Sequence, residues 1–300
     1  MPEKLYFYYN ADVPVGKVAA VIAILAFWCA LAHAAADWLN EGGDPQHSGR
    51  QKREKILNAA NVKDLKLIWK LRLDNQAKGA HSLTAPVILG HWITNRGTKE
   101  LIFIAGSSDK VYAVDADLGR LFWSRRLESA PSPKPRCADG WPAAPALAPG
   151  PDVEDDDDDV QQAIRPVYVL SSAGRLHMLH PTTGTDISTP VQFVAPNPNV
   201  AGLFVEGGVV RTTASGGCGR PPTYWSQVTA NGVVYKLKKG SPSAHAVLYA
   251  FDAVTGKQLY SSGDAITSFV RSSALALANG HICFGTEDNT LYCFGFPVDL

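Results

Sequence analysis

The segment LIFIAGSSDKVYAVDADLGRLFW, residues 101–123, contains a frame that returns at residues 248–260 as LYAFDAVTGKQLY. Both copies read Tyr-Ala-x-Asp-x-x-x-Gly-x-x-x-aromatic. The frame is filled by Tyr112, Ala113, Asp115, Gly119 and Trp123 in the first copy, and by Tyr249, Ala250, Asp252, Gly256 and Tyr260 in the second. Internal repetition of this kind indicates an architecture in which copies of one supersecondary unit lie side by side.

Two further copies are less regular. Residues 167–188 read VYVLSSAGRLHMLHPTTGTDIS, which keeps Gly184 but has His180 and Ser188 where the frame has the aspartate and the aromatic residue. Residues 281–296 read HICFGTEDNTLYCFGF. Each copy alternates strand-like apolar runs with polar clusters, so we predict strand, turn, strand, turn, strand. We expect the frame glycine to take the positive φ that the second turn requires.

A repeat of about forty residues that forms four strands is typical of a propeller blade. We therefore predict an all-β fold, a β-propeller of four-stranded antiparallel blades, with a β-sandwich of repeated hairpins as the alternative. The copies predict four or five blades, in a ring that need not be complete. They map to residues 85–127, residues 142–194, a poorly marked stretch from 200 to 240, and a closing pair.

The last copy offers only three strands, at residues 274–278, 281–284 and 290–294. The segment LKLIWKLRL, residues 65–73, could supply the fourth, and it places Trp69 at the aromatic position of the frame. We predict that this N-terminal strand joins the C-terminal blade, because pairing the first and last strands removes an exposed sheet edge. The residues expected to have structural roles, in turns or packed on a neighbouring sheet, are Trp69, Asp115, Gly119, Trp123, Asp252, Gly256 and Tyr260.

Charge and composition exclude several classes of function. Among 300 residues, 28 are Lys or Arg and 28 are Asp or Glu, so the formal net charge is zero. This balance predicts neither a nucleic-acid footprint nor a polybasic membrane patch. The 26 glycines and 20 prolines fit many short strands and turns better than a helical bundle. We expect a monomer.

The N-terminus has the pattern of a signal peptide over residues 1–36. Lys4 and Lys17 precede the apolar run VAAVIAILAFWCAL, residues 18–31, and small residues follow in LAHAAADW. We predict export to the periplasm or secretion with cleavage near residue 36, and a membrane anchor at residues 18–36 as the alternative. Residues 37–300 would then form the propeller domain, with an acidic loop insertion at 151–160.

Four cysteines follow the signal peptide and allow three pairings. Cys137 and Cys218 lie in loops rich in glycine and proline, so we predict a disulfide between them. Cys283 and Cys293 lie on consecutive strands, in a register that we expect to place them on opposite faces of the sheet. The absence of a Cys-x-x-Cys motif excludes the usual structural zinc and c-type haem patterns.

The repeat resembles that of the quinoprotein dehydrogenases that bind pyrroloquinoline quinone (PQQ), and of related propeller scaffold proteins. Residues 37–73, DWLNEGGDPQHSGRQKREKILNAANVKDLKLIWKLRL, are similar to the segment that enters their closing strand. The similarity is carried by Trp38, Gly42, Gly43, Asp44, Asn61, Val62, Leu65 and Trp69. It covers most of residues 37–130 and 245–300.

The resemblance implies a quinone-dependent oxidoreductase that binds PQQ and calcium in the axial cleft of the propeller and acts on a small alcohol or aldehyde. By this reading Trp141 is a candidate stacking surface for the quinone, and Arg220 a candidate partner of its carboxylate. The alternative for both is an ordinary loop residue. The chain lacks the adjacent cysteine pair of the alcohol dehydrogenases and looks shortened. Two other hypotheses therefore remain: a non-catalytic envelope propeller that binds a protein partner, and an inactive relative.

Two charged features have a structural and a functional interpretation. The acidic run, Asp152, Glu154 and residues 155–159, could bind calcium through its oxygens, but it lacks the spacing of a calcium loop. We predict that it is a solvated insertion. His177 and His180 could be metal ligands, but we expect both to be surface residues.

Overall fold

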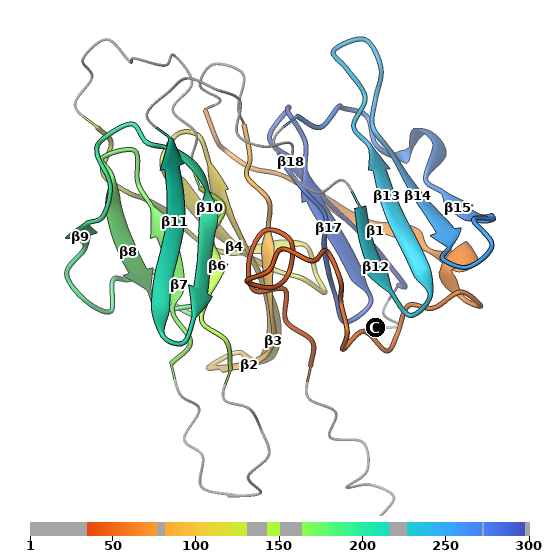
Figure 1. Cartoon of the computed structure of the whole chain (residues 1–300), viewed down its shortest axis with the longest axis horizontal. Helices are drawn as coiled ribbons and strands as arrows, with labels where there is room; N and C mark the ends of the chain where they lie inside the picture. Colours follow the sequence, from red (N-terminus) through yellow and green to blue (C-terminus); the bar gives the residue numbers. More distant parts are fainter. Residues whose placement is uncertain are drawn as a thin grey trace, which may run out of the picture. The chain divides into compact units, whose positions relative to one another are not determined.

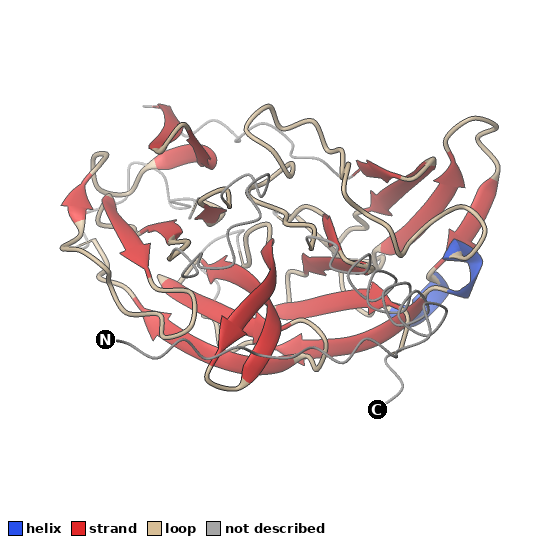
Figure 2. Ribbon diagram, turned by 90° about the horizontal axis from the view of Figure 1, so that it is seen from below, coloured by secondary structure: helices blue, strands red, loops and turns tan. Residues whose placement is uncertain are grey.

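The computed structural model describes residues 35–76, 82–130, 143–150, 164–215, 227–271 and 273–297. Over these ranges the regular elements are strands, apart from two short 3-10 helices, η1 (Val62–Asp64) and η2 (Gly263–Ala265) (Figures 1 and 2). In the same ranges, none of the helices is long and apolar enough to cross a membrane. The segment predicted to be a signal peptide lies almost wholly outside the described residues.

The strands of the described ranges form five antiparallel sheets, four of them four-stranded. The first contains β2 (Val87–Thr94), β3 (Gly97–Gly106), β4 (Lys110–Asp115) and β5 (Arg120–Arg126). The second contains β6 (Ala146–Leu147), β7 (Val167–Leu170), β8 (Arg175–Leu179) and β9 (Val191–Gln192). The third is the hairpin of β10 (Asn199–Glu206) and β11 (Val209–Ser215).

The fourth sheet contains β12 (Gln227–Ala230), β13 (Val233–Lys238), β14 (Val247–Asp252) and β15 (Gln258–Ser261). The fifth contains β16 (Ala276–Ala278), β17 (His281–Gly285), β18 (Thr290–Gly295) and β1 (Lys66–Arg72). Each four-stranded sheet has its strands in the order in which the chain visits them, except for β1. These are propeller blades, so the predicted all-β fold class is confirmed.

The N-terminal strand completes the C-terminal blade, as predicted. Strand β1 pairs antiparallel with β18, so that Trp69 lies opposite Cys293 and Arg72 opposite Thr290. The pairing covers the edge that β18 would otherwise expose.

The predicted blade boundaries are correct for the first two sheets and wrong for residues 200–240. This stretch does not form one blade. Residues 199–215 are the hairpin β10–β11, whereas β12 and β13 join the segment 248–260 in the fourth sheet. The division follows from the pairing of β13 with β14, in which Tyr235 lies opposite Ala250.

The turns of the repeat have the conformations that the frame predicts. Gly119, Gly184 and Gly256 have φ of 61°, 70° and 69°. The amide of Gly119 donates to the carbonyl of Asp115 at 2.9 Å, and that of Gly256 donates to Asp252 at the same distance. The frame aspartate also stabilises the turn. Asp115 Oδ1 accepts the amide of Leu118 at 3.1 Å, and Asp252 Oδ1 accepts the amide of Thr255 at 2.7 Å, so in both copies the donor directly precedes the glycine.

Tryptophan side chains join each of two blades to the next. The indole Nε1 of Trp69 donates to the carbonyl of Ala116 at 2.6 Å, and that of Trp123 donates to the carbonyl of Pro181 at 2.7 Å. Each indole also lies against the glycine of the turn that it contacts, Trp69 against Gly119 and Trp123 against Gly184. A Cβ atom on Gly119 would lie 2.5 Å from Trp69, and one on Gly184 would lie 2.7 Å from Trp123. Glycine is therefore required for close approach as well as for φ.

The expectation for Cys283 and Cys293 is wrong, because the two residues form a disulfide. They lie directly opposite each other on β17 and β18, with a Cα–Cα distance of 4.2 Å. Residues opposite each other in an antiparallel pair project from the same face, whereas a slip of one residue would have put them on opposite faces. The predicted partners Cys137 and Cys218 lie outside the described residues.

Candidate functional site

The segment 36–51 runs along the first strands of the blades. The amide of Trp38 donates to the carbonyl of Ile88 in β2 at 2.8 Å, and the amide of Ile88 donates back at 3.0 Å. The amide of Leu147 in β6 donates to the carbonyl of Leu39 at 2.7 Å. The entry segment is thus an integral part of two sheets.

The other end of the same segment binds two more blades. The amide of Gln51 donates to the carbonyl of Thr229 in β12 at 2.9 Å. The side-chain amide of Gln51 donates to the carbonyl of Leu277 in β16 at 3.0 Å. The innermost strands of a propeller surround its central channel. Here the first strands of four sheets, β2, β6, β12 and β16, are all hydrogen-bonded to this one segment.

A buried polar group lies in the middle of this segment. Asn40 is fully buried, and neither its amide nitrogen nor its amide oxygen has a hydrogen-bond partner among the described residues. Glu41 is also buried, and burial raises the pKa of its carboxyl group well above the usual range, although the charge of Lys239 opposes the shift. Burial in turn lowers the pKa of Lys239.

These described residues do not fit a site for PQQ and calcium. Asn40 and Glu41 offer oxygen atoms, but the charged group that interacts with Glu41 is the ammonium of Lys239, which would repel a calcium ion. Trp38, the indole of this segment, is 1% exposed and has no free face to offer a quinone. The predicted quinone-binding residues Trp141 and Arg220, and the acidic run 151–160, lie outside the described residues.

The expectation that His177 is a surface residue is wrong. Its side chain is 2% exposed, with Nδ1 2.9 Å from Asp186 and Nε2 2.9 Å from Glu128. Asp186 also pairs with Arg125 of the preceding blade, so the cluster joins β5 to β8. The sequence pattern around His177 does not indicate this cluster, because Glu128 belongs to another blade. His180 is partly exposed, and its Nδ1 accepts the amide of Thr182.

The hairpin β10–β11 is a sheet whose second strand has one neighbouring strand among the described residues. Among the described residues, β11 pairs with β10 and with no other strand, whereas the second strand of each other sheet has two neighbours. The inner strand β10 packs through Val200, Leu203 and Val205 on Leu170 of the second sheet. Such an edge presents backbone donors and acceptors that can pair with another chain.

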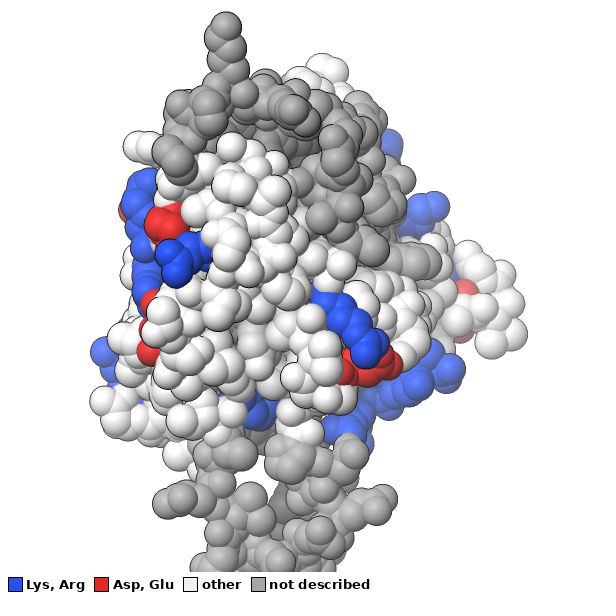
Figure 3. All heavy atoms as spheres, turned by 60° about the vertical axis from the view of Figure 1, so that its left-hand side comes forward, with Lys and Arg blue, Asp and Glu red and all other residues white. Residues whose placement is uncertain are grey.

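The surface beside this edge carries few charges, although the hairpin itself has an exposed ion pair between Arg211 and Glu206. Residues 187–205 read ISTPVQFVAPNPNVAGLFV, which contains no Asp, Glu, Lys or Arg. Ile187, Val191 and Val209 are 38%, 56% and 50% exposed. Figure 3, which brings β8, β9 and β11 forward, shows a largely uncharged face with a few charged groups.

No protein-family model and no curated protein matches the sequence. Solved structures similar to the chain include a quinohemoprotein alcohol dehydrogenase from Comamonas testosteroni, with 19% identity, 82% of this chain and 31% of that chain covered, and a TM-score of 0.36. A europium-containing methanol dehydrogenase is 12% identical, with 79% of this chain and 32% of that chain covered and a TM-score of 0.36. BamB from Moraxella catarrhalis is 14% identical, with 77% of this chain and 100% of that chain covered and a TM-score of 0.27.

The chain spans about a third of the length of the two dehydrogenases. The class of the protein is defined by its own blades, with their repeated turns and tryptophan contacts. It is a β-propeller protein.

Proposed function

We propose that this chain is an exported, non-catalytic β-propeller of the cell envelope that binds a protein partner at the edge of β11. The observation that carries the proposal is the two-stranded sheet β10–β11 among four-stranded blades. An extended segment of the partner would add a third strand through main-chain hydrogen bonds. Export rests on the sequence pattern of residues 1–36.

The geometry of the hairpin supports this mode of binding. Its turn consists of Gly207 and Gly208, both with positive φ, as in a tight two-residue hairpin. With Glu206 opposite Val209, hydrogen-bonded and non-hydrogen-bonded pairs alternate along the strands. Alternate residues of β11 therefore direct their backbone N–H and C=O groups away from β10, toward an incoming strand.

The chemistry of the surface favours an apolar partner segment. Val209 on β11 is exposed, and so is Val191 on β9 of the second sheet, while the run of residues 187–205 supplies no charge for an ionic partner. A partner segment with apolar residues on one side of the added strand would cover these side chains. Its backbone would form hydrogen bonds with the free N–H and C=O groups of β11.

A photo-crosslinking residue at Arg211, which is on β11 and about half exposed, tests the interface in cells that produce the full chain. We expect one protein to be captured at this position. Adding Val209→Lys should reduce capture at least about tenfold, which corresponds to roughly 1.4 kcal/mol of binding free energy. A lysine on an edge strand opposes strand addition.

The matched control is Val254→Lys, because Val254 is 92% exposed in the β14–β15 turn, away from the open edge. This variant should leave capture at Arg211 unchanged. Equal loss of capture in both variants, or capture of the same protein by a crosslinker at position 254, would contradict the proposed edge.

The non-catalytic proposal also predicts the result of a redox assay. Because the chain has no adjacent cysteine pair and Trp38, Asn40 and Glu41 do not fit a quinone and calcium site, purified protein supplied with PQQ, calcium and simple alcohols should not reduce an artificial electron acceptor. Calorimetric titration with PQQ in the presence of calcium should give no stoichiometric binding heat. Alcohol-dependent reduction of the dye would favour the dehydrogenase and would count against the non-catalytic role.

A further inference from the structure

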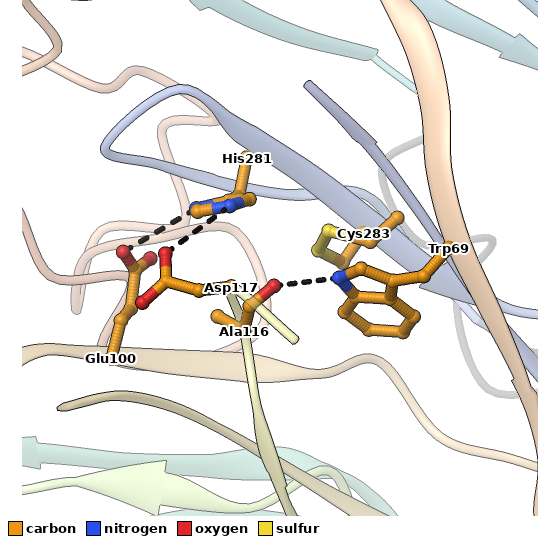
Figure 4. The surroundings of a disulfide bond; sticks show 7 residues. Trp69, Glu100, Ala116, Asp117, His281 and Cys283 are labelled. Carbon is orange, nitrogen blue, oxygen red and sulfur yellow. Dashed lines mark hydrogen bonds and ion pairs between the residues drawn. A yellow bond between two sulfur atoms is a disulfide. The ribbon is translucent and has the colours of Figure 1, made fainter. Parts of the chain in front are cut away.

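Three chemically reactive side chains meet at the junction that Trp69 makes between two blades. Glu100 lies in β3, and His281 begins β17 of the neighbouring sheet. Asp117 lies in the β4–β5 turn, directly after Ala116, whose carbonyl accepts the indole hydrogen of Trp69. Figure 4 shows both carboxylates directed at the imidazole of His281, beside the disulfide at Cys283. Docking of the tryptophan therefore holds the turn that carries Asp117 against the strand that carries His281.

The separations of these groups leave room between them. One potential ligand atom from each residue lies within 4.8 Å of the other two. Nδ1 of His281 is 3.4 Å from Glu100 Oε2, and Nε2 is 3.8 Å from Asp117 Oδ1. Both distances exceed those of good hydrogen bonds to a carboxylate, which are about 2.7–2.9 Å.

Two of the three side chains are buried and incompletely hydrogen-bonded. Glu100 and His281 are 7% and 8% exposed. Glu100 Oε1 has no hydrogen-bond partner among the described residues, and Nδ1 of His281 makes only the long 3.4 Å contact with Glu100 Oε2. A buried polar atom without a partner is destabilising, so this pair is incomplete without a ligand. Asp117 is 44% exposed, which leaves a path from solvent.

The electrostatic environment is that of a cation site. Nδ1 of His281 faces Glu100 and Nε2 faces Asp117, so a carboxylate lies on each side of the imidazole. Two carboxylates that face one imidazole therefore favour added positive charge at this point.

We propose that Glu100, Asp117 and His281 bind a divalent transition-metal ion that links the first and fifth sheets. One imidazole nitrogen and two carboxylate oxygens are donors that zinc accepts, whereas calcium and magnesium take oxygen ligands alone. Three protein ligands leave the fourth position of a tetrahedral ion to water on the exposed side of Asp117. The ion would bridge strand β17 to strand β3 and to the β4–β5 turn.

Zinc chloride titrated calorimetrically into the full chain, after removal of bound metal with a chelator, tests the proposal. Asp117→Asn is the informative variant, because Asp117 is partly exposed and its replacement should not impair folding. We expect the variant to bind zinc at this site more than about 100-fold less tightly, since loss of an outer-shell group alone costs 10–100-fold. Cobalt substituted for zinc should give a visible absorption band that the variant lacks.

Asp264→Asn is the matched control, because Asp264 is an exposed carboxylate 3.2 Å from another histidine, His245. It should leave the zinc isotherm unchanged. His281→Gln provides a second test from the opposite sheet and should also lose the zinc-dependent rise in melting temperature. Zinc binding that survives both Asp117→Asn and His281→Gln, or wild-type protein that binds no zinc, would overturn the proposal and leave a metal-free ion-pair cluster.

Discussion

Gly119→Ala is expected to lower the free energy of unfolding by about 2–5 kcal/mol, whereas Gly256→Ala should lower it by only about 1–2 kcal/mol. Both glycines close the same turn at φ near 65°, and alanine in that conformation costs about 1–2 kcal/mol. The difference arises from Trp69, which lies 2.5 Å from the position of a Cβ on Gly119. Displacing the indole adds an overpacking cost of about 1–3 kcal/mol. Urea denaturation measures both changes.

Gly256 is a matched control because nothing lies within 4 Å of its Cβ position. Gly184→Ala should behave like Gly119→Ala, since its Cβ would lie 2.7 Å from Trp123. Equal destabilisation by all three substitutions would mean that the positive φ alone explains why glycine is required at this position of the frame. It would also mean that the tryptophan contacts between blades add little to stability.

Loss of the disulfide through Cys283→Ala and Cys293→Ala together is expected to cost about 3 kcal/mol. The two residues are ten positions apart, and cross-linking a loop of this size removes about that much chain entropy from the unfolded state. Both cysteines are fully buried, so a thiol reductant should cleave this disulfide slowly in the folded protein. Guanidinium denaturation of the oxidised proteins measures the difference.

The comparison is best made in a chain that already carries Cys137→Ala and Cys218→Ala, so that other pairings cannot form. In that background the disulfide of β17 and β18 should be recovered as one cross-linked peptide after proteolysis. Free thiols at both positions in the unreduced protein would contradict the pairing, and equal stability of the variant would contradict its contribution.

The sequence predicted the parts of the fold that depend on local chemistry and on repetition. Gly119 and Gly256 could be assigned positive φ because few other residues adopt it in a tight turn. The closing role of Trp69 could be predicted because the first strand repeats a frame position that the last copy lacks. Neither inference requires knowledge of contacts between distant residues.

The pairing of Cys283 with Cys293 could not be predicted in the same way. Both lie in adjacent strands, but the face that each occupies depends on the register, and one residue of slip reverses it. The turn between β17 and β18 sets that register by pairing Gly285 with Leu291. The conformation of a polar turn of this length is weakly encoded in its composition, so only the structure decided the pairing.

From the amino-acid pattern one could infer that this protein is built from blades, where the turns of the regular copies lie and which strand completes the last blade, because spacing and glycine chemistry are local properties. Tertiary structure alone decided which charged groups meet. Glu100, Asp117 and His281 come from two sheets, and His177 meets Glu128 across another blade junction. Within the part of the chain that the structure describes, it also decided that β11 pairs with β10 alone. Residues far apart in the chain carry no common pattern, and their contact depends on how the blades pack.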